Sequence, residues 1–405
     1  MNNKKSSVPK LRFPEFTDAW EQRKLGKLAD FNPRSNLPDE FKYVDLESVV
    51  GTELTGYRFE NKLSAPSRAQ RLAQKGDIFY QTVRPYQKNN YLFEFEDENF
   101  VFSTGYAQLR PLINGRFLFS KLQEDRFVQQ VLDKCTGTSY PAINSSDLSE
   151  IKVYIPDNKQ EQQKIGSFFT ALDRLITTHQ RKLENVKKLK KSLLQKMFPK
   201  NGQEFPEIRF PEFTDAWEQG ALEKHIKTST EKNLDNKFTK NDVLSVSGDV
   251  GIVNQIEFQG RSFAGVSVSN YGIVNTGDIV YTKSPLKANP YGIIKTNKGK
   301  AGIVSTLYAV YTPNQNTDSI FIQYYFEFND RLNRYLKPLV NKGAKNDMKV
   351  SDDNALIGNV TFPKIQEQQK IGSFFTALDR LITTHQRKLE NVKNLKKALL
   401  QQMFV

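Results

Sequence analysis

A chain of 405 residues is too long for one compact core, so two or more domains are expected, and 38% hydrophobic residues exclude a disordered chain. The net charge of +14 favours an anionic partner such as nucleic acid, an acidic protein or a membrane surface. The single cysteine, Cys135, excludes an internal disulfide, and no apolar run approaches the roughly 18 residues of a membrane span. We therefore predict a cytoplasmic protein without a membrane partner.

The chain begins with a head motif that a variable region follows. The motif, RFPEFTDAWEQ, occupies residues 12–22, and we expect its Trp20 to anchor a core. Short β-branched or aromatic runs between turn residues then predict strands over 42–50, 77–83, 91–95 and 151–156. Apolar residues at helical spacing predict one helix over 116–134. We therefore expect a mixed α and β domain over residues 1–156, with a mostly antiparallel sheet.

A long basic helix is predicted over residues 157–198. Lys159–Lys200 holds 11 Lys or Arg residues and 3 Asp or Glu residues, a net charge of +8. Asp157 or Asn158 is suited to cap the amino end of the helix. Pro199 ends it, because proline cannot continue the helical hydrogen-bond ladder.

The remaining residues repeat this plan. The head motif returns at 209–219, and we expect a linker and a second mixed domain over 199–363. Strands are predicted over 242–248, 278–283, 302–306 and 308–312, and one helix over 319–340. The tract Glu161–Phe198 recurs as Glu367–Phe404 with 35 of 38 positions identical, which predicts a second long helix over 364–405. Lys364–Phe404 holds 8 basic and 3 acidic residues.

The two variable domains also share a residual pattern. GDIFY at Gly76–Tyr80 corresponds to GDIVY at Gly277–Tyr281, and STGYAQLRP at Ser103–Pro111 corresponds to STLYAVYTP at Ser305–Pro313. The offset between the copies rises from 197 at the head motif to 206 at the long helices. A steady rise indicates one order of elements with short insertions in the second copy, so the chain is two copies of one unit.

A coiled-coil seam follows from the apolar positions of the long helices. With Ile165 as the first a position, two apolar residues recur in every seven, the pattern of a paired helix. The predicted seam and partner-binding residues are Ile165, Phe168, Leu172, Leu175, Val186, Leu189, Leu193, Ile371, Phe374, Leu378, Leu381, Val392, Leu395 and Leu399. His179 and His385 occupy matching a positions, where we expect packed histidines and no metal.

Two nearly identical seams in one chain can pair with each other. If a pseudo-two-fold axis relates the halves, the helices run antiparallel and carry the two domains at opposite ends of a rod. The predicted fold class is therefore α+β, with two mixed α/β domains joined by two long antiparallel coiled-coil helices. Such a molecule suits duplex DNA, because two related domains can dock on two separated points of the double helix. The repeated surface could equally offer one docking patch twice.

The whole pattern resembles the specificity subunit of type I restriction–modification systems. The resemblance is carried by RFPEFTDAW before each domain, EQQKI at the start of each long helix, and the later LL and MF. It implies a non-catalytic chain whose two domains read the halves of a bipartite, asymmetric site on double-stranded DNA. It also implies partners: two copies of a methyltransferase subunit that uses S-adenosylmethionine, and restriction or translocase subunits that use ATP with Mg. No cofactor is expected in this chain.

Candidate DNA contacts lie in two loops of each domain that mix cations, amides and aromatic rings, the groups that contact phosphates and base edges. The alternative interpretation is an ordinary polar loop for the first loop of each domain, and a turn that merely closes the domain for the second. In the first domain the candidates are Arg84, Tyr86, Lys88, Asn89, Thr138, Ser139 and Tyr140. In the second domain they are Lys283, Lys287, Asn289, Tyr291, Lys342, Lys345 and Asn346.

Two other functions stay open at this point. Ala288–Gly292, ANPYG, resembles the Asn-Pro-Pro-aromatic motif of adenine methyltransferases but lacks its second proline, and we find no glycine-rich cofactor loop. A stand-alone DNA methyltransferase is therefore one alternative. A coiled-coil scaffold that gathers proteins without reading DNA is the other. No GxxxxGK[ST] loop is present, so we expect no ATP hydrolysis by this chain.

Overall fold

The chain divides into two compact units. The computed structural model describes residues 7–97, 99–137, 139–200, 202–286, 288–342 and 348–405. Unit 1 comprises Met1–Arg181 with His385–Val405, and unit 2 comprises Lys182–Thr384. Each long helix therefore contributes residues to both units.

Unit 1 contains two four-stranded sheets. The first, in the order β2-β11-β8-β9, is antiparallel throughout: β2 Ala29–Phe31, β11 Tyr106–Pro111, β8 Ile78–Gln81 and β9 Tyr91–Leu92. The second, in the order β6-β3-β10-β7, pairs β3 and β10 in parallel: β6 Arg58–Asn61, β3 Glu40–Val44, β10 Phe100–Ser103 and β7 Ala69–Leu72. Two short pairs complete the strands: β1 Glu21–Lys24 with β12 Lys152–Ile155, and β4 Val49–Val50 with β5 Glu53–Leu54.

Unit 2 repeats the first of these sheets. Its order β14-β21-β18-β19 matches β2-β11-β8-β9: β14 Ile226–Thr228, β21 Tyr308–Pro313, β18 Ile279–Thr282 and β19 Ile294–Thr296. The antiparallel pair of β13 Glu218–Ala221 and β24 Asn359–Phe362 likewise corresponds to β1 and β12. The other pairs are β15 Leu244–Ser247 with β16 Gly251–Asn254, β17 Gly272–Val274 with β20 Gly302–Val304, and β22 Asn341–Lys342 with β23 Met348–Lys349. The shared topology and the predominantly antiparallel pairing confirm the prediction of two copies of one α+β unit.

The single helix predicted in each domain is wrong, because each is a pair of helices. In unit 1, α1 Gly115–Leu122 and α2 Asp125–Leu132 are separated at Glu124, whose backbone is extended at ψ 137°. In unit 2, α6 Ser319–Glu327 and α7 Asn329–Leu336 are separated at Phe328, extended at ψ 110°. The apolar spacing persists through both breaks, because both helices of a pair face the same core. The short helices are α3 Ser145–Ser149, α5 Gln255–Gln259, and the 3-10 turns η1 Leu25–Lys27, η2 Pro85–Gln87, η3 Leu222–Lys224, η4 Lys240–Asp242 and η6 Asp353–Leu356.

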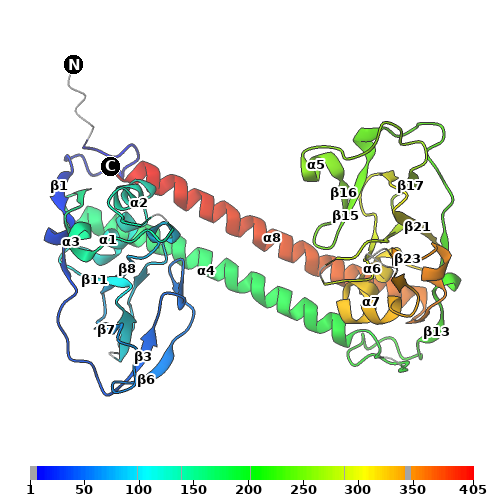
Figure 1. Ribbon diagram of the computed structural model, residues 1–405, viewed down its shortest axis with the longest axis horizontal. Coiled ribbons are helices and arrows are strands. Elements are labelled where there is room, and N and C mark those ends of the chain that lie inside the picture. The colour runs from blue at the N-terminus through cyan, green and yellow to red at the C-terminus, as the bar shows by residue number, and fades with distance from the viewer. Residues whose placement is uncertain (1–6, 98, 138, 201, 287, 343–347) are drawn as a thin grey trace. The chain divides into compact units, whose positions relative to one another are not determined.

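The two long helices are α4 Lys159–Lys196 and α8 Ile365–Met403 (Figure 1). Asn158 caps α4, as predicted: its side chain accepts hydrogen bonds from the backbone N–H groups of Gln160 (2.8 Å) and Glu161 (3.3 Å). The helices run antiparallel within each unit. In unit 1, Asp173 pairs with Lys396 while the later residue His179 meets the earlier residue His385. In unit 2, Lys190 pairs with Asp379 at 2.6 Å, and Phe198 packs on Phe375.

Each core receives the end of the other repeat's helix. Phe404, at the end of the second repeat, packs in unit 1 with its ring centroid 6.0 Å from Trp20, 5.5 Å from Phe117 and 5.7 Å from Phe169. Phe198, at the end of the first repeat, packs in unit 2 at 6.2 Å from Trp217 and at 5.7 Å from Phe321. Both tryptophans are buried, as predicted for core anchors. Neither repeat can therefore complete its core alone, which explains why both copies of the tract end in the same Met-Phe pair.

The head motif is repeated because it holds the start of its long helix. Arg12 donates two hydrogen bonds to Glu161, at 2.7 and 2.8 Å, and Arg209 does the same to Glu367 at 2.8 and 2.7 Å. Both glutamates are buried in the first turn of their helices, where the helix dipole also favours a negative charge. A bidentate arginine satisfies such a carboxylate, whereas an unpaired one would be costly.

Gly166 in α4 lets another helix approach closely. A Cβ atom at Gly166 would lie 2.6 Å from the backbone nitrogen of Phe117, at the start of α1. At the equivalent Gly372 in α8, the nearest atom would be the Oδ1 of Asp318 at 3.1 Å. Glycine is therefore required sterically at Gly166, where the obstructing atom is backbone and cannot move aside.

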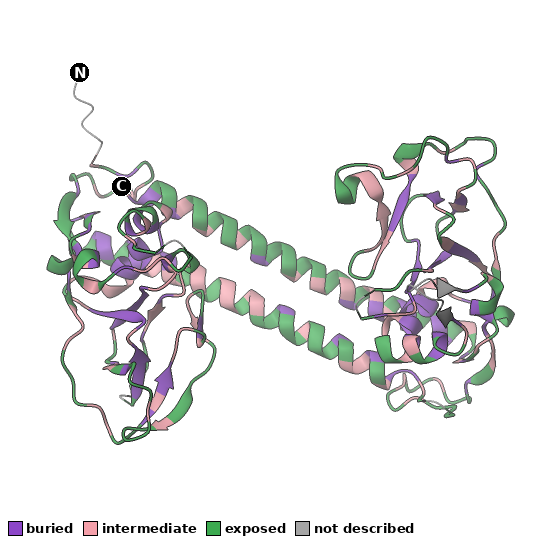
Figure 2. Cartoon of the chain, in the orientation of Figure 1, coloured by how far each residue is buried: buried purple, intermediate pink, exposed green. Residues whose placement is uncertain are grey.

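The seam of the helix pair differs from the prediction by one residue at every second position. Leu175, Leu189, Leu381 and Leu395 were predicted in the seam, but each is at least 42% exposed, so their assignment to the seam is wrong. Their places are taken by the residues that follow them, Ile176, Lys190, Ile382 and Lys396. A shift of one residue replaces Lys182 and Lys196 in the seam by Leu183 and Met197. The two lysines that the shift brings in, Lys190 and Lys396, are paired with Asp379 and Asp173. The outer faces of both helices stay exposed (Figure 2).

Candidate nucleic-acid interface

The two loops of unit 1 that the sequence predicts as candidate DNA contacts lie side by side. The guanidinium of Arg84 stacks on the ring of Tyr140 at 4.4 Å, and the Arg84 N–H donates to the carbonyl of Pro141 at 2.8 Å. A β-bridge joins Val83 to Ala142. Tyr86 and Tyr140 stay exposed beside this contact, at 50% and 63%. The result is a surface of cationic and aromatic groups, which suits contact with bases and phosphates.

The backbone of this surface is strained. Arg84 and Lys88 both have φ 55°, in the left-handed region, and they flank the turn η2. Such a conformation costs a residue with a side chain on the order of 1 kcal/mol or more and persists only when neighbours fix it. Lys88 is fixed by an ion pair to Asp125 and a hydrogen bond of 2.9 Å to the carbonyl of Gln123. Strain held in place at an exposed aromatic turn points to a functional surface.

The other candidates of unit 1 have structural partners or face solvent. The side chain of Asn89 accepts a hydrogen bond from the N–H of Gly51 at 2.8 Å, so it holds the neighbouring loop. Ser139 is exposed beside Tyr140. Thr138 lies outside the described residues.

In unit 2 the candidates are turned inward. Lys283 pairs with Asp352 at 2.7 Å, and Asn289 is buried. Tyr291 packs against the core, and its carbonyl accepts the hydroxyl hydrogen bond of Tyr281 at 2.7 Å. Gly292 closes the loop at φ 91°, where an added Cβ would lie 1.9 Å from the carbonyl oxygen of Thr282. The ANPYG segment is therefore a tight internal turn.

Four further candidates of unit 2 have side chains that the structure does not describe. Lys342 ends the short strand β22. Lys345 and Asn346 lie outside the described residues, as does Lys287. Their contact with DNA stays a prediction.

The structure adds a pocket in unit 1 that sequence reasoning missed. Its volume is about 680 Å³, and it lies between the loop after β2 and the strand β7. Its lining residues are Asn32, Pro33, Arg34, Ser35, Asn36, Leu37, Gln70 and Arg71. Asn32 joins it to the surface already described, because its side chain donates to the Oγ of Ser145 at 2.9 Å, in the segment that follows Tyr140. Comparison of the two halves of the sequence would have found it, since the arginines occur in one half only.

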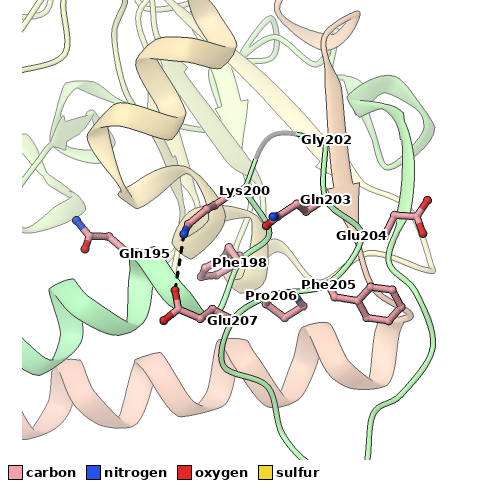
Figure 3. Close-up of a pocket in the computed structure, with 9 residues that line it drawn as sticks. All are labelled: Gln195, Phe198, Lys200, Gly202, Gln203, Glu204, Phe205, Pro206 and Glu207. Atoms are coloured by element: carbon pink, nitrogen blue, oxygen red, sulfur yellow. Dashed lines mark ion pairs between the residues drawn. The ribbon is translucent and has the colours of Figure 1, made fainter.

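A second hollow, in unit 2, lies in the linker after α4 (Figure 3). Its volume is about 590 Å³, and its charged lining consists of Lys200, Glu204 and Glu207. Lys200 faces Glu207 at 3.8 Å, and Lys196 pairs with the same carboxylate at 2.7 Å. The cations here are already neutralised, so the hollow does not suit an anionic ligand.

The four exposed leucines that lie outside the seam, Leu175, Leu189, Leu381 and Leu395, form a second kind of surface. Each stands one position before a seam residue, and in an antiparallel pair such positions from the two helices lie on the same flank. Leu175 and Leu395 therefore share a flank in unit 1, and Leu189 and Leu381 share the equivalent flank in unit 2. The helices around them are basic. Each unit thus presents an exposed pair of leucines on helices whose net charge is positive.

Metal and membrane sites were also sought. Within the part of the chain that the structure describes, no three side chains of His, Cys, Asp or Glu gather as a metal site. His179 and His385 meet at 3.4 Å between their Nδ1 atoms, as packed seam residues. No helix among the described residues is both long and apolar enough to cross a membrane.

The fold and these surfaces define a class of protein: a duplicated α+β chain whose two units share an antiparallel helix pair and carry different loop surfaces. Comparison with known proteins agrees. Residues 18–188 match the family model described as type I restriction modification DNA specificity domain. The HindI specificity subunit of a type I restriction enzyme from Haemophilus influenzae is 26% identical over 44% of this chain, a match that spans 40% of that relative. The putative MjaX specificity subunit from Methanocaldococcus jannaschii is 24% identical over 98% of this chain and 95% of its own.

Solved structures share the fold. The type I restriction–modification S subunit from M. genitalium matches with a TM-score of 0.63 at 15% identity, over 98% of this chain and 99% of that one. A chain from a study of complex assembly in a type I system matches with a TM-score of 0.51 at 18% identity, over 95% and 97%. The family model, the relatives and the solved structures to which this chain is similar are thus all described as type I restriction–modification specificity proteins or complexes.

Proposed function

We propose that this chain is the non-catalytic subunit that reads a bipartite, asymmetric site on double-stranded DNA for a type I restriction–modification complex. The observation that carries the proposal is the contrast between what the two units share and what they do not. They share the head segment, the helix pair and the sheet order. They differ at the loops, since unit 1 exposes Tyr86 and Tyr140 whereas unit 2 buries Asn289 and pairs Lys283. Equal scaffolds with unequal loops suit the reading of two different half-sites.

The partner subunits follow from the same repetition. We propose one methyltransferase subunit on each unit, docked on the leucine pairs Leu175 with Leu395 and Leu189 with Leu381. An amphipathic helix that also carries acidic residues would suit such a pair, because both long helices have a net positive charge. S-adenosylmethionine, and ATP with Mg, would then act on the methyltransferase and restriction subunits and not on this chain.

Exchange of one domain tests the reading function. We would replace Leu28–Val153 by the equivalent segment of a related subunit and map methylated adenines in cells that carry the assembled complex. One half-site is expected to change while the other stays the same and serves as the internal control. A change in both half-sites would contradict the assignment of one half-site to each unit.

Two further measurements separate the alternative functions. Methyl transfer by the purified chain alone, with labelled S-adenosylmethionine and mixed duplex DNA, would identify a stand-alone methyltransferase. An equal affinity for all duplex sequences, with and without the methyltransferase subunit, would identify a scaffold that does not read DNA.

A further inference from the structure

The pocket between the loop after β2 and the strand β7 differs in charge from the same place in unit 2. The sequence offset of 197 that relates β2 to β14 places Glu231 at the position of Arg34. The strand pairing places Gly272 at the position of Arg71: Arg71 pairs with Phe102 directly before Ser103, and Gly272 pairs with Val304 directly before Ser305. Unit 1 thus has Arg34 and Arg71 where unit 2 has Glu231 and Gly272, and the residue beside them in unit 2 is Lys232, which forms a β-bridge with Gly272.

Neither arginine has an acidic partner. Across the described residues, no ion pair involves Arg34 or Arg71, whereas nearby Arg110 is held by Asp77 at 2.9 Å. The Nε of Arg71 is buried and has no hydrogen-bond acceptor. Burial lowers the pKa of the Arg71 guanidinium, and no described carboxylate acts against this shift. A half-buried cation without a counter-charge is costly, so an anion that enters the pocket would be bound favourably.

The remaining lining groups suit an oxyanion. Ser35, Asn36 and Gln70 are exposed and can donate hydrogen bonds from a hydroxyl and two amides. Asn32, at the rim of the pocket, has a left-handed backbone conformation with φ 48°. Its side chain accepts a hydrogen bond from the N–H of Gln108 in β11 at 3.0 Å, which fixes its position. The loop that carries Ser35 and Asn36 therefore starts from a fixed residue.

We propose that Arg34 and Arg71 form a phosphate-binding subsite, present in unit 1 only, for the DNA backbone at the half-site that unit 1 reads. The inference rests on the proposed DNA-reading function and deepens it. The shape of the site favours a phosphate over a base edge. Base edges lie inside a groove and are reached by protruding side chains, whereas phosphates project outward and fit a recess. In unit 2, Glu231 and Lys232 offset each other at the equivalent place, so the two half-sites are held with unequal electrostatic strength.

The salt dependence of binding measures this contact. The assembled complex would be titrated with duplexes that carry the methylated motif of the host genome, over 50 to 200 mM salt. For the Arg34→Gln/Arg71→Gln variant we expect roughly tenfold weaker binding at 100 mM salt, with similar loss for matched and mismatched duplexes. The slope of log K against log salt should fall in magnitude by about 0.9 for each phosphate released. Replacement of the contacted phosphate by a neutral methylphosphonate should lower the affinity of the wild-type complex for the duplex and leave the affinity of the variant complex unchanged.

Matched variants separate charge from folding. Arg71→Lys keeps the charge and should keep the wild-type slope, and Arg34→Gln changes an exposed residue without disturbing the core. Arg23→Gln is the control in the same unit, because Arg23 is already paired with Glu21 at 2.7 Å, and it should have no effect on the slope.

The outcomes are distinct. Failure of the wild-type complex to prefer its motif would overturn the proposed function itself. Specific wild-type binding with an unchanged slope and affinity in the double variant would overturn the subsite alone. A changed base preference at one position with an unchanged slope would show a base contact and would also overturn the phosphate assignment.

Discussion

Truncation of Phe404 should destabilise a part of the chain that is remote from it in sequence. Phe404 lies in the second repeat, but its ring packs among Trp20, Phe117 and Phe169 in unit 1. We expect Phe404→Ala to destabilise unit 1 and to leave unit 2 unaffected. The matched variant is Phe198→Ala in the first repeat, which should destabilise unit 2 instead, because Phe198 packs on Trp217.

The size of the effect follows from burial and packing. Phe404 is 1% exposed, and truncation of such a phenylalanine to alanine costs about 3–5 kcal/mol through lost transfer energy and the cavity that remains. The three aromatic contacts place it in a well-packed site, where collapse into the cavity is restricted. Phe404→Leu retains most of the volume and should cost less than about 1.5 kcal/mol.

Native-state hydrogen exchange resolves the two units without assuming that the whole chain unfolds in one step. In the Phe404→Ala variant, amides of α1 in unit 1 should exchange faster by roughly two to three and a half orders of magnitude, since 1.4 kcal/mol corresponds to tenfold. Amides of α6 in unit 2 should keep their rates. The Phe198→Ala variant should show the reverse pattern.

Faster exchange in α6 of the Phe404→Ala variant, with unchanged exchange in α1, would contradict this prediction. That result would place the end of α8 in the core of its own repeat, and the exchange of helix ends between the repeats would then be incorrect. An equal acceleration in both units would likewise contradict two separately completed cores.

Two further predictions concern the partner surface and pH. The double variant Leu175→Lys/Leu395→Lys should bind one copy of the methyltransferase subunit where the wild type binds two, as counted by native mass spectrometry. The control variant Thr178→Lys, at an exposed residue, should still bind two copies. Loss of both copies, or of neither, in the double variant would refute the assignment of one copy to each unit. Burial lowers the pKa of His225 from its ordinary value of 6.5, so the unfolded chain binds the proton more readily than the folded chain. The free energy of unfolding of unit 2, measured by urea titration, should therefore fall as the pH drops from 7.5 to 5.5, and it should fall less in the His225→Asn variant. An equal fall in both proteins would contradict the assignment of this pH dependence to His225.

The sequence alone determined the large-scale organisation. The repeat of RFPEFTDAWEQ and of the tract from Glu161 establishes two copies of one unit, because identical long segments at drifting offsets have no other simple origin. The long helices follow from their 3.5-residue apolar period, and the N-cap at Asn158 from local chemistry. These features depend on neighbours in the chain, so local patterns suffice to find them.

The sequence was less reliable where several registers or breaks satisfy the same pattern. Leu175 and Ile176 are both apolar, so apolar spacing alone fits two seams that differ by one residue. Only the structure, in which Leu183 is buried and Lys182 is exposed, shows which of the two seams forms. The helix over 116–134 breaks at Glu124 although its apolar spacing continues, because spacing reports which side faces the core and not where the backbone turns.

Tertiary structure alone decided which residues meet. The stacking of Arg84 on Tyr140 joins loops more than 50 residues apart, and Phe404 completes the core around Trp20 from the other end of the chain. The recess of Arg71 exists because β7 and the loop after β2 approach each other in space. Such contacts depend on the free energy of the whole fold, in which burial of Phe404 and the absence of a carboxylate near Arg71 are set by residues far away in the sequence.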